Sequence, residues 1–198
     1  INEALNQPLK SVDLTEFGAT HTGKVRDMCV LNDRRILVTT DRVSAFDRVL
    51  GTIPYKGQVL NQLSGWWFEQ LGDVVNNHMI SMPDPNVMIT HEATPLPVEV
   101  IVRGYITGST STSLWTLYEE GVQRPYGLDL PTGLVKNSKL PTPVITPTTK
   151  AEVGEHDERL TSAEVLERGL VEPELWAQVQ QVALDIFAAG QAAAQKAG

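Results

Sequence analysis

Apolar and polar residues alternate in short runs over much of the first half of the chain. Runs 25–31 and 35–40 have the composition of β-strands, and the pair Asn32-Asp33 between them is typical of a hairpin turn. Apolar residues then recur at helical spacing over residues 58–71, and Gly72 follows as a stop signal. This part of the chain is therefore predicted to form a β-hairpin followed by a helix.

Proline and glycine interrupt the middle of the chain. Residues 83–97 contain four prolines, which predicts a loop with a short strand. The apolar run 98–103 predicts one continuous strand, and residues 113–120 predict a short helix that ends near Gly121. Residues 125–147 contain five prolines and are expected to be mostly extended or loop.

Helical patterns dominate the last part of the chain. Thr161 and Glu164 have the spacing of a capping box, and Pro173 suits the first position of the next helix. That helix carries one apolar stripe, formed by Leu175, Trp176, Val179, Val182, Ala183, Ile186 and Phe187. Strands first and helices later favour an α+β fold, with a domain boundary expected between residues 90 and 100.

Composition narrows the possible classes of protein. The 198 residues carry 24 acidic and 16 basic side chains, a net charge of −8, which argues against general nucleic-acid binding and against an anionic membrane surface. A locally basic pocket for a phosphorylated metabolite is still compatible with this charge. Cys29 is the single cysteine, which excludes an intrachain disulfide and an all-cysteine metal site. No stretch has the pattern of a signal peptide or a membrane span, so we expect a cytoplasmic protein.

A candidate anion clamp follows the apolar run 98–102. Arg103 ends this run, and the glycine- and hydroxyl-rich stretch after it includes Gly104, Gly108 and Ser109. A guanidinium offers a planar donor fork to phosphate or carboxylate, and glycines let backbone N–H groups approach the anion. The residues alone leave a second interpretation open, which is a buried strand with a surface arginine and a Ser/Thr-rich turn.

A glycine-containing turn at residues 23–27 offers a second place for phosphate. Lys24 could contact phosphate oxygens while N–H groups of the turn cradle them. The spacing of a Walker A loop is absent, and an ordinary charged hairpin turn is the alternative. Lys56 lies close to the expected start of a helix, where anions are favoured, although most lysines are simply solvated.

Acidic and hydroxyl side chains gather after the run 35–40. Asp41, Ser44 and Asp47 could bind a substrate hydroxyl or amine at the end of this strand. The alternative is an Asp-rich turn with local pairing of Asp41 with Arg42 or of Asp47 with Arg48, which contributes little if it is exposed.

Further candidates lie elsewhere in the chain. Lys150 could neutralise phosphate charge, and Asp157 could take part in Mg²⁺ coordination, which needs oxygen ligands. Trp66 and Trp67 are expected in the core or at an interface rather than beside a ligand. On their own, none of these residues decides between a functional and a structural role.

Taken together, these segments resemble one known family. GKVRD at 23–27, DRVSAFD at 41–47, VEVIVRGYITGS at 98–109 and TPTTK at 146–150 occur in the order and approximate spacing of the phosphoribosylaminoimidazole-succinocarboxamide synthase family, also called SAICAR synthetase. The resemblance covers the chain from about Leu9 onward, and it is specific because several independent motifs agree.

The resemblance implies an ATP-dependent ligase of purine biosynthesis. Such enzymes join L-aspartate to the carboxylate of carboxyaminoimidazole ribonucleotide (CAIR) and form SAICAR, ADP and phosphate. Because a carboxylate is a poor electrophile, ATP converts it into an acyl phosphate or a similar species before the amine attacks. ATP and Mg²⁺ are the implied cofactors, and CAIR and L-aspartate are the implied small-molecule partners. A homo-oligomer is compatible, whereas nucleic acid and membrane are not expected.

The resemblance also implies roles for individual residues. The nucleotide-binding set comprises Gly23, Lys24, Val25, Arg26, Glu99 and Lys150. The substrate-binding set comprises Asp41, Ser44, Asp47, Lys56, Arg103 and Ser109. Within it, Arg103 and Ser109 would hold the 5′-phosphate of CAIR. The catalytic set comprises Lys24, Lys150 and Asp157. Metal ligands stay unassigned.

The implied fold has two domains with ATP between them. A small, kinase-like antiparallel β domain for nucleotide binding spans residues 1–97, and a larger α+β domain for substrate and nucleotide spans residues 98–198. Family members continue into a strand with an Asp-x-Lys-x-Glu-Phe-Gly motif and then an Asp-Ser-Ser-Arg type segment, and neither occurs in this sequence. We therefore expect the second domain to be incomplete and the 198-residue chain alone to be inactive.

Two other classes of function stay open at this point. A phosphotransferase on a related kinase-like scaffold, such as an inositol-phosphate kinase, would not need both segment 98–109 and segment 41–47. A non-catalytic nucleotide-binding fragment would bind ATP without turning it over. Formation of ADP that depends on both CAIR and aspartate distinguishes the ligase from both.

Overall fold

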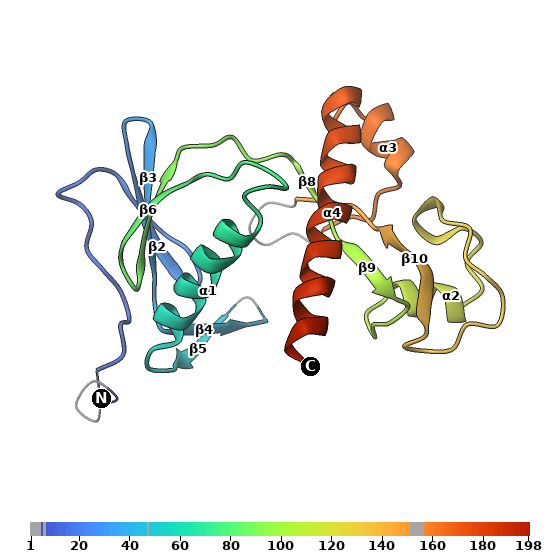
Figure 1. Ribbon diagram of the computed structural model, residues 1–198, viewed down its shortest axis with the longest axis horizontal. Helices are drawn as coiled ribbons and strands as arrows, with labels where there is room; N and C mark the ends of the chain where they lie inside the picture. The colour runs from blue at the N-terminus through green and yellow to red at the C-terminus, as the bar shows by residue number, and fades with distance from the viewer. Residues whose placement is uncertain (1–4, 6, 47, 151–156) are drawn as a thin grey trace. The chain divides into compact units, whose positions relative to one another are not determined.

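A computed structural model describes residue 5 and residues 7–46, 48–150 and 157–198. Contacts within the chain divide it into two units, Ile1–Thr94 (unit 1) and Pro95–Gly198 (unit 2). Antiparallel strands dominate unit 1, and unit 2 combines short antiparallel strands with helices, as Figure 1 shows. The predicted α+β class is confirmed. Within the described residues, no helix is long and apolar enough to cross a membrane.

Unit 1 is built on a five-stranded antiparallel sheet. Its strand order is β1-β2-β3-β7-β6, with strands β1 (Thr20–Thr22), β2 (Arg26–Leu31), β3 (Arg34–Thr39), β6 (Met79–Asp84) and β7 (Val87–His91). The predicted hairpin is confirmed, since β2 and β3 pair across a turn at Asn32-Asp33. The second hairpin, β6–β7, reaches into residues 83–97, where a loop with a short strand was predicted, and β7 is a short strand in that range. Pro83 is tolerated there because β6 is an edge strand, where a missing N–H need not break the ladder.

A separate hairpin and one helix complete unit 1. Strands β4 (Arg42–Ala45) and β5 (Arg48–Thr52) pair antiparallel, and helix α1 spans Lys56–Gln70, close to the predicted helix. The tryptophans were expected in the core or at an interface; Trp66 is 44% exposed and so lies outside the core, and an interface role for it stays a prediction. The core of unit 1 forms around the sheet, where the buried apolar residues include Leu14, Cys29, Val38 and Met88.

Helix α1 approaches the sheet closely at Gly57. A Cβ placed there would lie 2.3 Å from the Thr39 carbonyl oxygen and 2.6 Å from Asn86 Nδ2. Gly57→Ala should therefore destabilise unit 1 by about 1–3 kcal/mol, because overpacking forces the helix away from β3. Urea denaturation followed by circular dichroism measures this change. Gly51→Ala is the matched control, since a methyl group there meets nothing within 4 Å, and equal midpoints for the two variants would contradict the prediction.

The predicted single strand 98–103 is two strands in unit 2. Strand β8 (Val98–Glu99) pairs with β11 (Thr148–Thr149), and β9 (Val102–Tyr105) pairs with β10 (Lys139–Ile145). The chain changes partner between β8 and β9, at residues 100–101. The apolar run is continuous in sequence, but its hydrogen bonds go to two different strands.

The helices of unit 2 follow the sequence signals. Helix α2 (Leu114–Glu119) is capped by Ser113, whose side chain accepts a hydrogen bond from the Thr116 N–H. Helix α3 (Ser162–Glu167) begins at the predicted capping box of Thr161 and Glu164, with both of its hydrogen bonds formed. The long helix α4 spans Pro173–Ala197, with Pro173 at its start.

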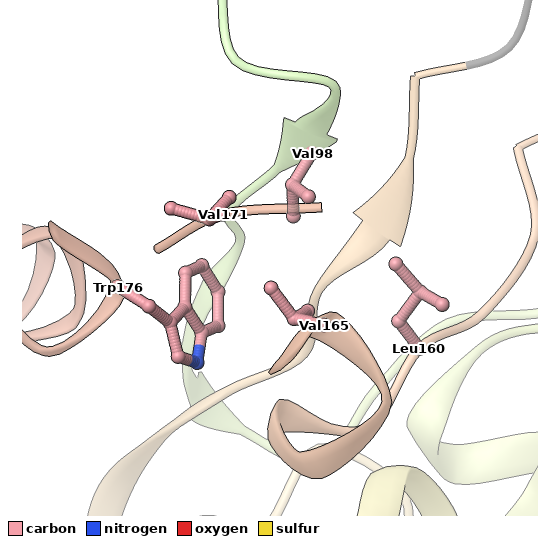
Figure 2. Close-up of a cluster of buried hydrophobic side chains, with 5 residues drawn as sticks. All are labelled: Val98, Leu160, Val165, Val171 and Trp176. Atoms are coloured by element: carbon pink, nitrogen blue, oxygen red, sulfur yellow. The ribbon is translucent and has the colours of Figure 1, made fainter. Parts of the chain in front are cut away.

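Two apolar clusters hold unit 2 together. One of them is shown in Figure 2 and brings β8, α3 and α4 around the indole of Trp176; its buried members are Val98, Leu160, Val165, Val171 and Trp176. The other lies beneath α2 and comprises Ile106, Leu114, Leu117, Tyr126 and Leu140. Of the predicted α4 stripe, Trp176 is fully buried, whereas Leu175 is 40% exposed.

Candidate functional site

The glycine-containing turn of unit 1 joins β1 to β2. Lys24 is exposed in this turn, and the Gly23 N–H donates to the Arg26 carbonyl at 2.8 Å. The Val25 carbonyl accepts hydrogen bonds from both the N–H and the hydroxyl of Thr40. The turn is thus fixed to the end of β3, with its lysine at the surface, as the sequence prediction of a phosphate-contacting lysine requires.

Asp41 has a clear structural role. It is buried, and its Oδ2 accepts from the Leu9 N–H at 2.8 Å while its Oδ1 accepts from the Gly57 N–H at 2.9 Å. The second bond satisfies one of the donors left open at the N-terminus of α1, where Tyr55 provides no side-chain cap. The local geometry therefore favours a helix-capping role for Asp41 over the predicted contact with substrate.

The other predicted substrate residues of unit 1 are partly accessible. Ser44 is half-buried in β4 opposite Val49, and Lys56 is half-buried as the first residue of α1. Asp47 lies outside the described residues. These contacts with substrate stay predictions.

Asp27 and Arg42 form a buried ion pair that the sequence reasoning missed. Arg42 donates to Asp27 at 2.9 Å, which replaces the pairing with Asp41 considered from sequence. Burial works against ionisation of Asp27, but hydrogen bonds from Arg42, the Val12 N–H and Thr22 outweigh it and lower the pKa of the carboxyl below its usual value. The sequence did contain a signal for this pair. Asp27 and Cys29 are two positions apart in β2 and therefore lie on the same buried face, where a carboxylate needs a partner.

Arg103 lies in β9 beside a cavity of unit 2. Its Nε donates to the hydroxyl of the fully buried Thr146 at 2.9 Å, which fixes the orientation of the guanidinium. The cavity has a volume of about 480 Å³, and Lys139 contributes a second cationic side chain to its lining. Helix α4 forms its other wall, with Phe187 close to Gly104.

Ser109 does not line this cavity. It is exposed in the loop that follows β9, whereas the lining includes Thr107 and Tyr105 from the same segment. A Cβ on Gly104 would lie 3.0 Å from the Phe187 ring, so glycine lets β9 and α4 approach each other beside Arg103. An anion site at Arg103 stays a prediction, and Ser109 lies outside the wall of the cavity.

A second group of predicted residues meets in unit 2. Lys150 Nζ lies 2.6 Å from Glu99 Oε1, although the two residues are far apart in sequence. The hydrogen bond to Glu99 raises the pKa of Lys150, and the charge of Asp157 adds a smaller effect in the same direction. The pair is substantially exposed, so its lysine is accessible to a ligand phosphate. Three of the predicted nucleotide or catalytic residues thus lie in one electrostatic group.

The described residues contain no group of three or more histidine, cysteine or acidic side chains that could hold a metal ion. Mg²⁺ normally requires several oxygen ligands in near-octahedral geometry. We therefore assign no metal ligand, and the predicted involvement of Asp157 in Mg²⁺ coordination stays a prediction.

Comparisons with known proteins agree on one family. The family model for SAICAR synthetase matches residues 19–198. A phosphoribosylaminoimidazole-succinocarboxamide synthase of Legionella pneumophila (strain Lens) is 51% identical over 182 residues, which cover 92% of this chain and 58% of that protein. A solved structure of a SAICAR synthase from Saccharomyces cerevisiae in complex with SAICAR has a TM-score of 0.77 and 31% identity, and covers 91% of this chain and 64% of the yeast chain. The chain thus spans about three-fifths of the length of such relatives.

Proposed function

Because this chain belongs to the SAICAR synthetase family, we propose that it provides the ATP-binding turn and the ribonucleotide phosphate site of an ATP-dependent ligase. The reaction joins L-aspartate to the carboxylate of CAIR, with ATP converted to ADP and phosphate. The single cysteine agrees with a cytoplasmic location.

The cavity beside Arg103 carries this proposal. Its volume of about 480 Å³ lies in the range of small-molecule sites, and Arg103 and Lys139 give it two positive charges. Such a pair suits a phosphate monoester, because a guanidinium can donate two parallel hydrogen bonds to its oxygens. We assign the 5′-phosphate of CAIR to this place, with the hydroxyl of Thr146 holding the guanidinium in position.

Lys24 and Lys150 are assigned to ATP. Each is accessible, and each is held by a fixed backbone, Lys24 in the β1–β2 turn and Lys150 next to β11. Their positive charges would stabilise the charge that builds up on the phosphate oxygens during transfer. Glu99 limits the motion of Lys150 through the 2.6 Å ion pair. The remaining predicted contacts, including those of Ser44 and Lys56, are part of the same proposal.

The chemistry proceeds by transfer of the γ-phosphoryl group of ATP to the carboxylate of CAIR. The resulting acyl phosphate is a good electrophile, and the aspartate amine attacks its carbonyl carbon, loses a proton and expels inorganic phosphate. Binding and orientation supply much of the rate enhancement in such a sequence. The residues of this chain contribute charge and position at the phosphates, and no step depends on a metal ligand assigned here.

The dependence of ADP release on each substrate tests the proposal. The complete gene product is mixed with ATP, CAIR and L-aspartate, and ADP is followed in a coupled assay while each component is omitted in turn. We expect sustained ADP release only when all three are present, together with SAICAR detected by mass spectrometry. A phosphotransferase would release ADP at the full rate without aspartate, and a nucleotide-binding protein without activity would release none. Either outcome would show that the ligase assignment is wrong.

A further inference from the structure

The side chain of Arg42 is saturated with hydrogen bonds inside unit 1. Its Nε donates to the Lys24 carbonyl at 3.1 Å, and its terminal nitrogens reach the Gly23 carbonyl at 3.0 Å and the Lys10 carbonyl at 2.5 Å. The same two nitrogens hold both carboxylate oxygens of Asp27, at 2.9 and 3.2 Å. A guanidinium has five N–H donors, and each of them has an acceptor here.

The acceptors come from three separate segments. Gly23 and Lys24 belong to the β1–β2 turn, Asp27 to β2, and Lys10 to the segment that precedes the sheet. Arg42 is 8% exposed and Asp27 is fully buried, so these contacts are protected from water. A buried ion pair is an inefficient way to gain stability, because desolvation offsets much of the attraction. Its effect here is to fix the carbonyl side of the turn, in addition to the hydrogen bonds of Gly23 with Arg26 and of Val25 with Thr40.

The hydrogen bonds of Arg42 to the turn carbonyls also set the direction of the N–H groups in the turn. In a trans peptide, the carbonyl and the following N–H point in opposite directions. Because the carbonyls of Gly23 and Lys24 face the guanidinium, the N–H groups of Lys24 and Val25 are directed away from it. Successive N–H groups with a common direction form a cradle for an anion.

Asp41, the residue before Arg42, fixes the backbone from which the Arg42 side chain extends. Asp41 binds the backbone N–H groups of Leu9 and Gly57, so the chain just before Arg42 is tied both to the N-terminal segment and to α1. Arg42 therefore extends from a fixed backbone to a fixed carboxylate, and the turn adapts to it.

We propose that Arg42, braced by Asp27, is a positioning residue that holds the Gly23–Val25 turn in the conformation that binds the phosphates of ATP. The proposal rests on the proposed assignment of this turn to ATP. Arg42 would affect nucleotide binding indirectly, by holding the conformation of the turn. Arg42 touches no substrate in this scheme.

Arg42→Lys tests the proposal with the charge retained. A lysine has one nitrogen, which cannot reach Asp27 and the carbonyls of Gly23 and Lys24 together. We expect the dissociation constant for a fluorescent ADP analogue, N-methylanthraniloyl-ADP, to rise about tenfold, since small displacements of binding groups have large effects. The Gly23 amide, which bonds to the Arg26 carbonyl, should exchange its hydrogen faster. In the complete gene product, the KM for ATP should rise while the KM for CAIR does not.

Arg35→Lys is the matched control in the same sheet. Arg35 pairs with Glu92 through Nε at 2.7 Å and a terminal nitrogen at 2.6 Å, and makes no contact with the turn among the bonds described. This variant should bind the ADP analogue like the wild type. Equal affinity and equal Gly23 exchange for Arg42→Lys and Arg35→Lys would overturn the proposal.

Two outcomes separate this proposal from the function it rests on. If the wild-type protein does not bind the ADP analogue, the assignment of the turn to ATP fails. Faster exchange of the Gly23 amide in Arg42→Lys would still show that Arg42 holds the conformation of the Gly23–Val25 turn. If Arg42→Lys does not fold, the double variant Asp27→Asn with Arg42→Gln replaces it, because it leaves no unpaired buried charge. Wild-type affinity in a folded double variant would refute the role of Arg42.

Discussion

Replacing Trp176 by alanine should lower the free energy of unfolding of unit 2 by about 3–5 kcal/mol, because removal of a buried indole loses apolar burial and leaves a cavity. Trp176 is 1% exposed and packs with Val98, Val165 and Val171, as Figure 2 shows. Its Nε1 also donates to the Ser162 hydroxyl at 2.7 Å. The indole thus joins α4, α3 and β8, and no neighbouring side chain can replace all three contacts.

Hydrogen exchange and urea denaturation together measure this loss. Exchange of the Val165 amide, which donates to the Thr161 carbonyl in α3, reports on unit 2 specifically. Leu175→Ala is the control at the adjacent position of α4, where the side chain is 40% exposed and the expected loss is small. Similar destabilisation by the two substitutions would show that Trp176 is not the centre of this core.

Replacing Arg103 by alanine in the complete gene product should weaken CAIR binding about 10- to 100-fold, the effect of losing hydrogen bonds to a charged group. ATP affinity should change little, because ATP is assigned to Lys24 and Lys150 and not to the cavity beside Arg103. Arg103→Lys should fall between wild type and alanine, since it keeps the charge but loses the planar donor fork.

Separate KM measurements for CAIR and for ATP test this selectivity. Arg124→Ala is the matched control in unit 2, because Arg124 pairs with Asp129 at the surface, with 65% of its side chain exposed, and lies outside the cavity. It should leave both KM values unchanged. Equal losses of CAIR and ATP binding in Arg103→Ala would contradict the assigned role of this arginine.

Local patterns in the sequence were reliable for individual elements. The β2–β3 hairpin follows from two β-type runs around a turn pair, and α3 begins at the capping box of Thr161 and Glu164. These signals succeed because the interactions that define them join residues a few positions apart. The sequence motifs also occur along the chain in the order typical of the family, which is why the family and the α+β class could be predicted from sequence.

The pattern of apolar residues did not predict where the chain changes its strand-pairing partner. Residues 98–103 are uniformly apolar apart from Glu99 and Arg103, yet β8 and β9 pair with different strands. The sequence left open whether Trp66 lies in the core or at an interface, because hydrophobic character alone does not say which face of α1 meets the sheet; in the structure Trp66 is 44% exposed. The ion pair of Lys150 with Glu99 was not predicted from the sequence; it forms because β8 pairs with β11.

By itself, the sequence determined the classes of element, their order and the residue types available for phosphate. Only the tertiary structure decided that Arg42 pairs with Asp27, 15 residues away, rather than with the adjacent Asp41, and that Asp41 caps α1 through Gly57, 16 residues away. The physical reason is that a buried charge must find its partner wherever the fold brings a complementary group, and the packing of separate segments sets that position.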